Sequence, residues 1–302
     1  MIHGYPTSSW DWEAVARDLA TDHYVCLLDT PGYGFSDKPR DGWAYSLFDD
    51  ARLVDRFVTD ELHLESFTLV THDKGDTVGL ALLQLCQARE RSTGGSPYQI
   101  RAHVILTGNV WLPLARLTGL QKAYLSRRTG PLISRLMCGR ALAMALGFRL
   151  YTPRLDVQAT RSLASILDYQ GGTRIQHQII RYLDERRVHE ARWLAALVRS
   201  NAPTILVWGE KDPVAPTAVA DFVWDRVLAA EAGHAAPASY WRLPGANHYL
   251  QVGRPDVIAW LVRAAAAGAR PDPAAAPPGV NLVAAHGQMS PHSVDQGRGL
   301  LR

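Results

Sequence analysis

Four short runs of apolar and β-branched residues recur along the chain, and segments with helical periodicity lie between them. The runs cover residues 67–71, 100–106, 203–208 and 239–243. Near-continuous apolar runs of this length are typical of parallel strands that helices cover on both faces. The pattern therefore predicts an α/β fold with a mostly parallel sheet, to which a weaker run at residues 24–28 adds a further strand.

Amphipathic helices are predicted where apolar residues recur every three or four positions. The clearest are residues 9–20, 47–62, 77–89, 219–230 and 255–267. Between residues 111 and 200 the strand signals disappear, and arginine-rich amphipathic segments take over. A helical block between two strands is expected to be an inserted cap above the sheet, and its arginines are interpreted as solvated helix faces rather than an anion-binding patch.

These patterns divide the chain into parts. Residues 1–110 and 201–267 are expected to form the α/β core, and residues 111–200 the helical cap. Residues 268–302 are rich in Ala, Pro and Gly without periodicity, which is typical of a disordered tail.

Composition narrows the class of protein but not its function. The chain has 302 residues, 47% of them hydrophobic and 20% charged, with a formal net charge of +3. So small a net charge gives no reason to expect nucleic acid or a membrane as a partner. The three cysteines show no metal-binding spacing. Neither a metal nor an organic cofactor is expected. With no long apolar run and no leader pattern, the cytoplasm is the expected location.

The sequence around Asp73 predicts a sharp strand-to-helix turn. The apolar run at residues 67–71 leads into His72, Asp73, Lys74 and Gly75, and a helical pattern follows. Small residues two positions before and after Asp73 let the strand and the helix approach closely, which forces the central side chain to the top of the turn. Asp73 is therefore the candidate nucleophile.

An aspartate nucleophile restricts the chemistry. Attack of a carboxylate on an ester carbonyl gives an anhydride, whereas attack on an electrophilic sp³ carbon gives an alkyl-enzyme ester that water can hydrolyse. A strained epoxide or a carbon–halogen bond is a suitable substrate. The expected partner is thus a small molecule, an apolar epoxide or an alkyl halide.

Three further motifs follow the same order as in a known superfamily. His3-Gly4-Tyr5-Pro6 precedes the turn, and Gly209-Glu210-Lys211-Asp212 and Gly245-Ala246-Asn247-His248 follow it. Together they resemble the α/β-hydrolase superfamily, in its aspartate-nucleophile branch of soluble epoxide hydrolases and haloalkane dehalogenases. The segment from His72 to Asp76 also resembles the mesoderm-specific transcript proteins of that branch.

The resemblance implies a role for each motif. His248 would activate water against the ester on Asp73, and Asp212 would orient His248. The backbone N–H groups of Tyr5 and Lys74 would form the oxyanion hole, and the Tyr5-Pro6 bond would be cis. The acid is expected at Asp212 and not after the earlier strand at residues 100–106. Asn109 stands there, and its side chain cannot carry the negative charge that stabilises a protonated histidine.

The chain departs from the resemblance at two places. Haloalkane dehalogenases usually have a halide-binding tryptophan directly after the nucleophile, where this chain has Lys74; fluoroacetate dehalogenases have arginine there, but their second arginine would fall at Thr77. The superfamily also begins with strands that are missing here, because only Met1 and Ile2 precede the His-Gly motif. An open sheet edge is therefore expected.

The leading functional hypothesis is an epoxide-hydrolase-like enzyme. Ring opening produces an alkoxide that needs a proton donor, and Tyr182 lies where that branch places such a tyrosine. Tyr151, Tyr169 and Tyr124 are candidates for a second donor. The alternatives are a haloalkane dehalogenase and a non-catalytic binding protein on a hydrolase fold.

Overall fold

The computed structural model describes residues 1–40, 42–230 and 233–287. In these residues a five-stranded sheet has the order β1-β2-β3-β4-β5. The strands are Ser66–His72 (β1), Gln99–Leu106 (β2), Thr204–Gly209 (β3), Ala238–Leu243 (β4) and Asn281–His286 (β5). The first four are parallel and β5 is antiparallel to β4. The four strands predicted from apolar runs are thus confirmed.

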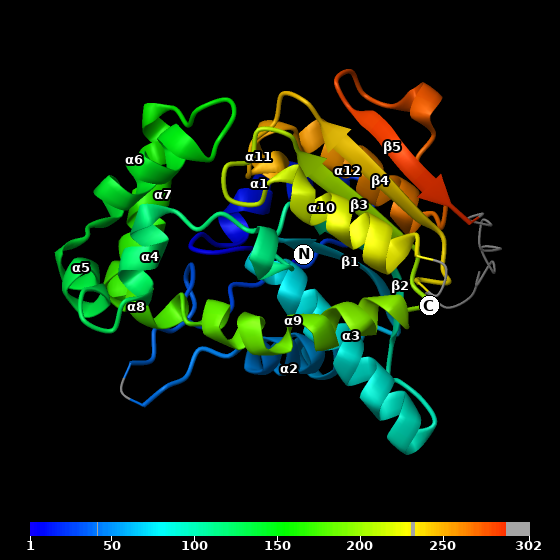
Figure 1. Cartoon of the computed structure of the whole chain (residues 1–302), viewed down its shortest axis with the longest axis horizontal. Helices are drawn as coiled ribbons and strands as arrows, with labels where there is room; N and C mark the ends of the chain where they lie inside the picture. The colour runs from blue at the N-terminus through cyan, green and yellow to red at the C-terminus, as the bar shows by residue number, and fades with distance from the viewer. Residues whose placement is uncertain (41, 231–232, 288–302) are drawn as a thin grey trace, which may run out of the picture.

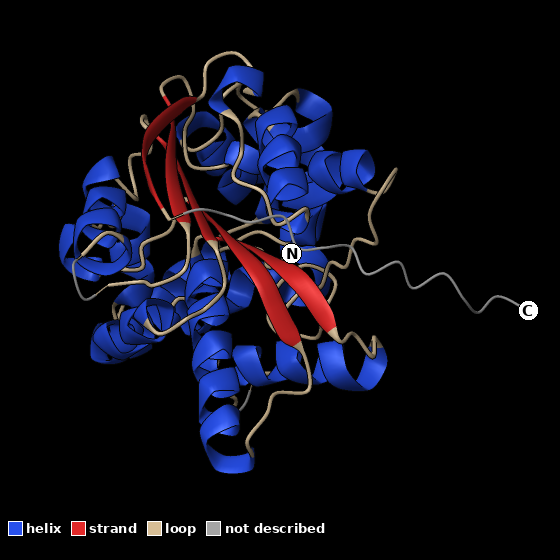
Figure 2. Ribbon diagram, turned by 90° about the vertical axis from the view of Figure 1, so that its right-hand side faces the viewer, coloured by secondary structure: helices blue, strands red, loops and turns tan. Residues whose placement is uncertain are grey.

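Helices cover both faces of the sheet (Figures 1 and 2). One face carries α1 (Glu13–Leu19) and α12 (Pro255–Ala266), and the other carries α2 (Leu47–Arg56), α3 (Lys74–Thr93), α9 (Tyr182–Val198) and α10 (Thr217–Val223). Successive strand residues face opposite layers: Leu69 and Leu206 belong to one core, and Val70 and Val207 to the other. This period of two produces the near-continuous apolar runs seen in the sequence.

A helical insertion, Leu112 to Val198, separates β2 from β3. Its elements are η3 (Leu112–Leu114), α4 (Gly119–Leu125), α5 (Gly130–Leu136), α6 (Gly139–Arg149), α7 (Val157–Asp168), η4 (Tyr169–Ile175), α8 (Gln176–Ile179) and α9. The helices α4 to α8 form a group at one side of the sheet (left in Figure 1), whereas α9 packs against α3. The insertion is helical, as expected, but its last helix belongs to a core layer.

Shorter helices complete the described chain. They are η1 (Ser9–Trp12), η2 (Phe57–Glu61), η5 (Trp224–Leu228), α11 (Leu250–Gly253) and η6 (Pro273–Ala275). The predicted helices at residues 47–62 and 219–230 each end in a π-helical turn, η2 and η5. The elbow helix α3 begins at Lys74, three residues before the predicted Thr77, because the turn occupies one residue.

Two expectations are wrong. The predicted strand at residues 24–28 is reduced to one parallel bridge between Leu28 and Ile2, and Ile2 also bridges Thr71. A strand needs a partner along its length, and Ile2 offers this segment only one position. The expected disordered tail is also wrong for residues 268–287, since Asn281–His286 pairs with β4 as β5 and covers that edge. The remainder of the expected tail, residues 288–302, lies outside the described residues.

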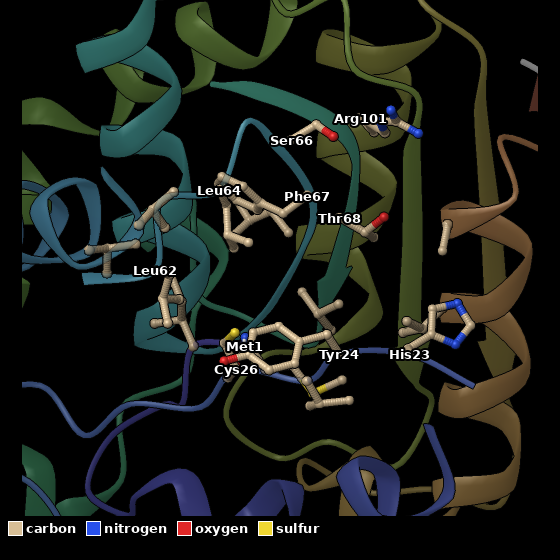
Figure 3. A pocket seen from close by; sticks show the side chains of 18 of the residues that line it. Met1, His23, Tyr24, Cys26, Leu62, Leu64, Ser66, Phe67, Thr68 and Arg101 are labelled. Atoms are coloured by element: carbon tan, nitrogen blue, oxygen red, sulfur yellow. Dashed lines mark hydrogen bonds between the residues drawn. The ribbon is translucent and has the colours of Figure 1, made fainter. Parts of the chain in front are cut away.

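A hollow of about 290 Å³ lies beside β1, where the open edge was expected (Figure 3). Its lining is mainly apolar and includes Met1, Tyr24, Cys26, Leu62, Leu64 and Phe67.

Candidate active site

Asp73 occupies a one-residue turn between β1 and α3. Its backbone has φ 51° and ψ −110°, a region that non-glycine residues rarely adopt. Neighbouring backbones come so close that a Cβ at Gly75 would lie 2.6 Å from the carbonyl oxygen of Ile2, and one at Gly4 would lie 2.7 Å from the Asp73 Cβ. Glycine at these positions lets the turn form. The predicted elbow is therefore present.

The backbone N–H of Tyr5 donates a hydrogen bond to Oδ2 of Asp73 over 2.9 Å. The Tyr5-Pro6 peptide bond is cis, as the sequence implied. This places one of the two predicted oxyanion-hole donors at the Asp73 carboxylate. The other, the N–H of Lys74, is in the first turn of α3, directly after the elbow.

The Lys74 side chain forms a buried ion pair. Its Nζ lies 2.5 Å from Oδ2 of Asp50, donates to Oγ1 of Thr30 over 3.0 Å, and lies 4.3 Å from the centroid of the Tyr33 ring. The lysine side chain is only 3% exposed. Its charge is therefore neutralised locally.

Asp212 and His248, the predicted acid and base, are hydrogen-bonded to each other. Oδ2 of Asp212 lies 2.7 Å from Nδ1 of His248, while Oδ1 accepts hydrogen bonds from the backbone N–H groups of Val214 and Ala215. The prediction that Asp212 lies within hydrogen-bond reach of His248 is confirmed. Among the described residues Asn109 makes no hydrogen bond to this pair; its backbone carbonyl accepts a hydrogen bond from the buried Arg186.

The charges around His248 favour its protonated form. Burial by itself lowers the pKa of His248, but Asp212, and then Asp73 and Asp11, outweigh burial and raise the pKa to about 9. His72 is the opposite case: burial, with the nearby His248, lowers the pKa of His72 to about 3. His72 is thus a neutral ring that bonds through Nε2 to the carbonyl of His248 over 3.0 Å.

Asp11 is a site residue that the sequence reasoning missed. It is 1% exposed, accepts hydrogen bonds from Oγ1 of Thr7 and, over 3.3 Å, from the Tyr151 hydroxyl. Burial raises its pKa to about 7, while Thr7, Tyr151 and His248 act in the opposite direction. The available signal was an acidic residue between Trp10 and Trp12, on a segment predicted as an amphipathic helix.

A cavity of about 190 Å³ contains Asp73 and His248. Its lining comes from the His-Gly loop, from α4 and α6 of the insertion, and from Val214. Apolar residues predominate: Tyr5, Pro6, Leu120, Tyr124, Leu142, Ala145, Leu146, Leu150 and Val214. A small, mostly apolar molecule therefore fits beside the carboxylate.

The candidate tyrosines differ in their surroundings. Tyr124 lines the cavity, is buried, and has a hydroxyl without a hydrogen-bond partner among the described residues; burial raises its pKa to about 12. Tyr182 is also buried, but it is not among the residues that line the cavity. Its ring centroid lies 5.8 Å from that of Tyr5, and burial followed by the Asp73 carboxylate raises the pKa of Tyr182 well above the ordinary value. Both phenols stay protonated at neutral pH.

Tyr151 and Tyr169 do not meet the requirement for a donor. The Tyr151 hydroxyl donates to Asp11, and the ring stacks on Tyr249 at 4.1 Å, outside the lining of the cavity. Tyr169 is 38% exposed and packs edge-on against Phe35. The expectation that Tyr151 reaches the substrate therefore does not agree with the geometry, because another partner already holds its hydroxyl.

The described residues contain no group of three or more His, Cys, Asp or Glu side chains arranged to hold a metal ion.

Comparison with known proteins places this geometry in a family. The family model described as alpha/beta hydrolase fold matches residues 1–255. The chain is 36% identical to LipZ of Mycobacterium tuberculosis, a protein named as a hydrolase, over 86% of this chain and 84% of LipZ. It is 31% identical to the mesoderm-specific transcript homolog protein of Bos taurus, over 72% of this chain and 64% of that protein.

Solved structures agree on the fold. Cfl2 from Burkholderia cenocepacia has a TM-score of 0.68 at 18% identity, covering 87% of this chain and 85% of Cfl2. Haloalkane dehalogenase DatA from Agrobacterium tumefaciens C58 has a TM-score of 0.67 at 20% identity, covering 87% and 86%. With an elbow, a paired acid and histidine, and a family model that spans most of its length, the chain belongs to the alpha/beta hydrolase fold family.

Proposed function

We propose that this hydrolase opens epoxides through an alkyl ester on Asp73, which water activated by His248 then hydrolyses. The observation that carries the proposal is the shared cavity: the elbow carboxylate and the histidine paired with Asp212 line the same apolar space. A carboxylate at the elbow suits attack on carbon, and a histidine held by an acid suits removal of a proton from water.

In the first step, an oxygen of Asp73 forms a bond to an epoxide carbon while the carbon–oxygen bond of the ring breaks. The hydrogen bond from the N–H of Tyr5 to Oδ2 fixes the carboxylate, so that Oδ1 is the attacking atom. The ring oxygen leaves as an alkoxide and takes a proton from a tyrosine. Tyr124 and Tyr182 are the proposed donors: Tyr124 is a buried phenol that lines the cavity with Asp73, and Tyr182 is a buried phenol whose pKa the charge of Asp73 helps to raise.

In the second step, His248 removes a proton from a water molecule, and the resulting hydroxide attacks the carbonyl carbon of the ester. The bond from that carbon to the alkyl oxygen then breaks; the departing alkoxide takes the proton of the new carboxylic acid and leaves as the diol, Asp73 is again a carboxylate, and the proton on His248 returns to the tyrosinate. The ester no longer carries the negative charge of Asp73, and that charge is one of the causes that raise the pKa of His248. Ester formation thus lowers the pKa of His248 and increases the fraction of it that is neutral at the stage that needs a proton acceptor. The N–H groups of Tyr5 and Lys74 would hold the developing oxyanion.

A haloalkane dehalogenase is the second candidate, since a solved neighbour carries that name. Release of a halide requires a donor that holds the anion. The ammonium of Lys74 already pairs with Asp50 and Thr30, so it is not free for a halide. The buried phenols of Tyr124 and Tyr182 instead suit protonation of an alkoxide, which supports the epoxide.

Replacing either proposed donor by phenylalanine should slow epoxide opening. Tyr124→Phe and Tyr182→Phe each remove one hydroxyl, and we expect epoxide turnover to fall about 10²-fold, the scale of one general-acid contact. Diol formation from a styrene-oxide-type epoxide is the measurement, with a matched primary bromoalkane assayed beside it. Bromoalkane turnover should change little.

Tyr169→Phe is the matched control, because this tyrosine is partly exposed and packs on Phe35. Faster release of bromide than of diol by the unaltered protein would favour the dehalogenase. Unchanged epoxide turnover in both phenylalanine variants would remove these tyrosines from the mechanism.

The pH dependence should respond to Asp11. Turnover needs neutral His248, so it should rise with pH through the pKa of this histidine. Asp11→Asn removes one of the negative charges that raise that pKa, and the midpoint of the rise should therefore move to lower pH. The kcat profile between about pH 5 and 10 measures it, and a midpoint that stays in place would show that Asp11 does not act on His248.

A further inference from the structure

We propose that one face of the helical insertion docks on an anionic phospholipid membrane. The docking surface is made of exposed side chains of two consecutive helices: Leu132, Arg135 and Leu136 on α5, and Arg140, Met144 and Phe148 on α6. The two helices lie in the group that stands at one side of the sheet (Figure 1). The docking surface is independent of the chemistry proposed at Asp73.

Large apolar side chains of α5 and α6 point into solvent. Leu132 is 58% exposed, Leu136 76%, Met144 56% and Phe148 68%. Within each helix the two residues are four positions apart, so they lie on the same side of that helix. Large apolar side chains exposed side by side on a helix mark a surface that contacts a partner or a membrane.

The charge of the surrounding sequence selects an anionic partner. Residues 111–155 contain eight basic side chains and no Asp or Glu: Arg116, Lys122, Arg127, Arg128, Arg135, Arg140, Arg149 and Arg154. Among the described residues none of these eight forms an ion pair, and those on α5 and α6 are exposed. The sequence predicted that these arginines lie on solvated helix faces, but it did not predict the exposed apolar residues between them. Exposed Leu, Met and Phe among unpaired arginines are typical of helices that lie in a membrane interface.

A concave site at the junction of α5 and α6 suits a phosphate headgroup. This cavity of about 610 Å³ is lined by Arg40, Arg135 and Arg174, beside Leu136 and Cys138. Asp168 also lines it, but Oδ1 of that carboxylate accepts hydrogen bonds from the N–H of Gly139 and from Thr173. The site has three guanidinium groups and one carboxylate, which is already hydrogen-bonded, so its net charge is positive.

The geometry suits a helix pair lying on a membrane rather than crossing it. Among the described residues no single helix is long and apolar enough to cross a membrane; α5 and α6 reach the required length and composition only together, and they meet at an angle of 102°. In the docked state their exposed side chains would enter the headgroup region. The α6 helix also lines the cavity with Asp73 through Leu142 and Leu146, so docking would bring that wall of the cavity close to the lipid.

Sedimentation of the full chain with vesicles tests the docking surface. We expect binding to vesicles of equal parts phosphatidylcholine and phosphatidylglycerol, much weaker binding to phosphatidylcholine alone, and a decline with added salt. Leu136→Ser with Phe148→Ser should weaken partitioning about tenfold or more, because two exposed apolar groups are lost. Arg135→Gln should weaken it about fivefold.

Matched controls carry the same changes elsewhere. Val188→Ser alters a residue of α9 that is 73% exposed, and Arg91→Gln alters an exposed arginine near the end of α3; both should bind like the unaltered protein. No binding to anionic vesicles, or equal losses in the controls, would overturn the proposal. Inhibition of binding by inorganic phosphate, with the serine variants unaffected, would assign the arginine cavity to a soluble anion instead.

Discussion

His248→Gln is expected to stop the proposed reaction at the ester and so to trap the substrate on the enzyme. Attack by Asp73 needs only an ionised carboxylate, whereas hydrolysis needs a base for the water. Turnover should fall about 10³-fold or more, while the peptide that contains Asp73 gains the mass of one epoxide. Peptide mass spectrometry after incubation with the epoxide measures this adduct.

Asp73→Asn is the matched control, since it keeps the size of the side chain and removes the nucleophile. It should give neither turnover nor adduct. A His248→Gln protein that still binds the epoxide but carries no adduct would contradict the ester mechanism. A complete lack of turnover and adduct in the unaltered chain would instead favour a non-catalytic binding protein.

Lys74→Met should destabilise the fold by about 3–5 kcal/mol, because it leaves the buried Asp50 carboxylate without its partner. Asp50 is 8% exposed, and burial is already the largest influence on its pKa, raising it against the opposing effect of Lys74. The free energy of unfolding in urea is the measurement. Arg52→Met, which removes the cation of the exposed pair with Asp49, should alter the free energy of unfolding by less than about 1 kcal/mol.

A second substitution separates charge burial from packing. Lys74→Met combined with Asp50→Leu removes both charges and should recover most of the lost stability, because an apolar pair of similar volume replaces a buried ion pair at little cost. If Lys74→Met alone is as stable as the unaltered protein, Asp50 does not depend on Lys74.

Much of the fold could be predicted because its determinants are local. Each of the four parallel strands is an apolar run, and the alternation between two cores requires such runs. The pair Asp212 and His248 was predictable from the resemblance of their two motifs to the α/β-hydrolase pattern, and each motif follows a strand whose carboxyl end meets the same edge of the sheet. Residues 24–28 also have strand composition, but composition does not supply the neighbour that a strand needs.

The rest of the site depends on contacts between distant segments. Asp11 lies near His248 because η1 packs against α11, and Tyr151 donates to Asp11 from 140 positions away. Tyr124 lines the cavity and Tyr151 does not, a distinction that follows from the packing of the insertion and not from any local pattern. The pairing of β5 with β4 is equally non-local, which is why a segment rich in Ala and Pro was expected to be disordered.

The elbow has a consequence for how this chain could acquire other chemistry. Around the turn at residue 73 a Cβ at Gly75 would meet the carbonyl oxygens of Ile2 and His3, and one at Gly4 would meet the Asp73 side chain, so the neighbouring segments pack tightly against the elbow. The segments around the elbow fix the position of the reactive group, and the side chain at position 73 determines which bonds that group can attack. Exchanging that side chain for a hydroxyl or a thiol would redirect the site from alkyl carbon to acyl carbon without rebuilding it. The glycines, which touch no substrate, would be the positions that tolerate no exchange.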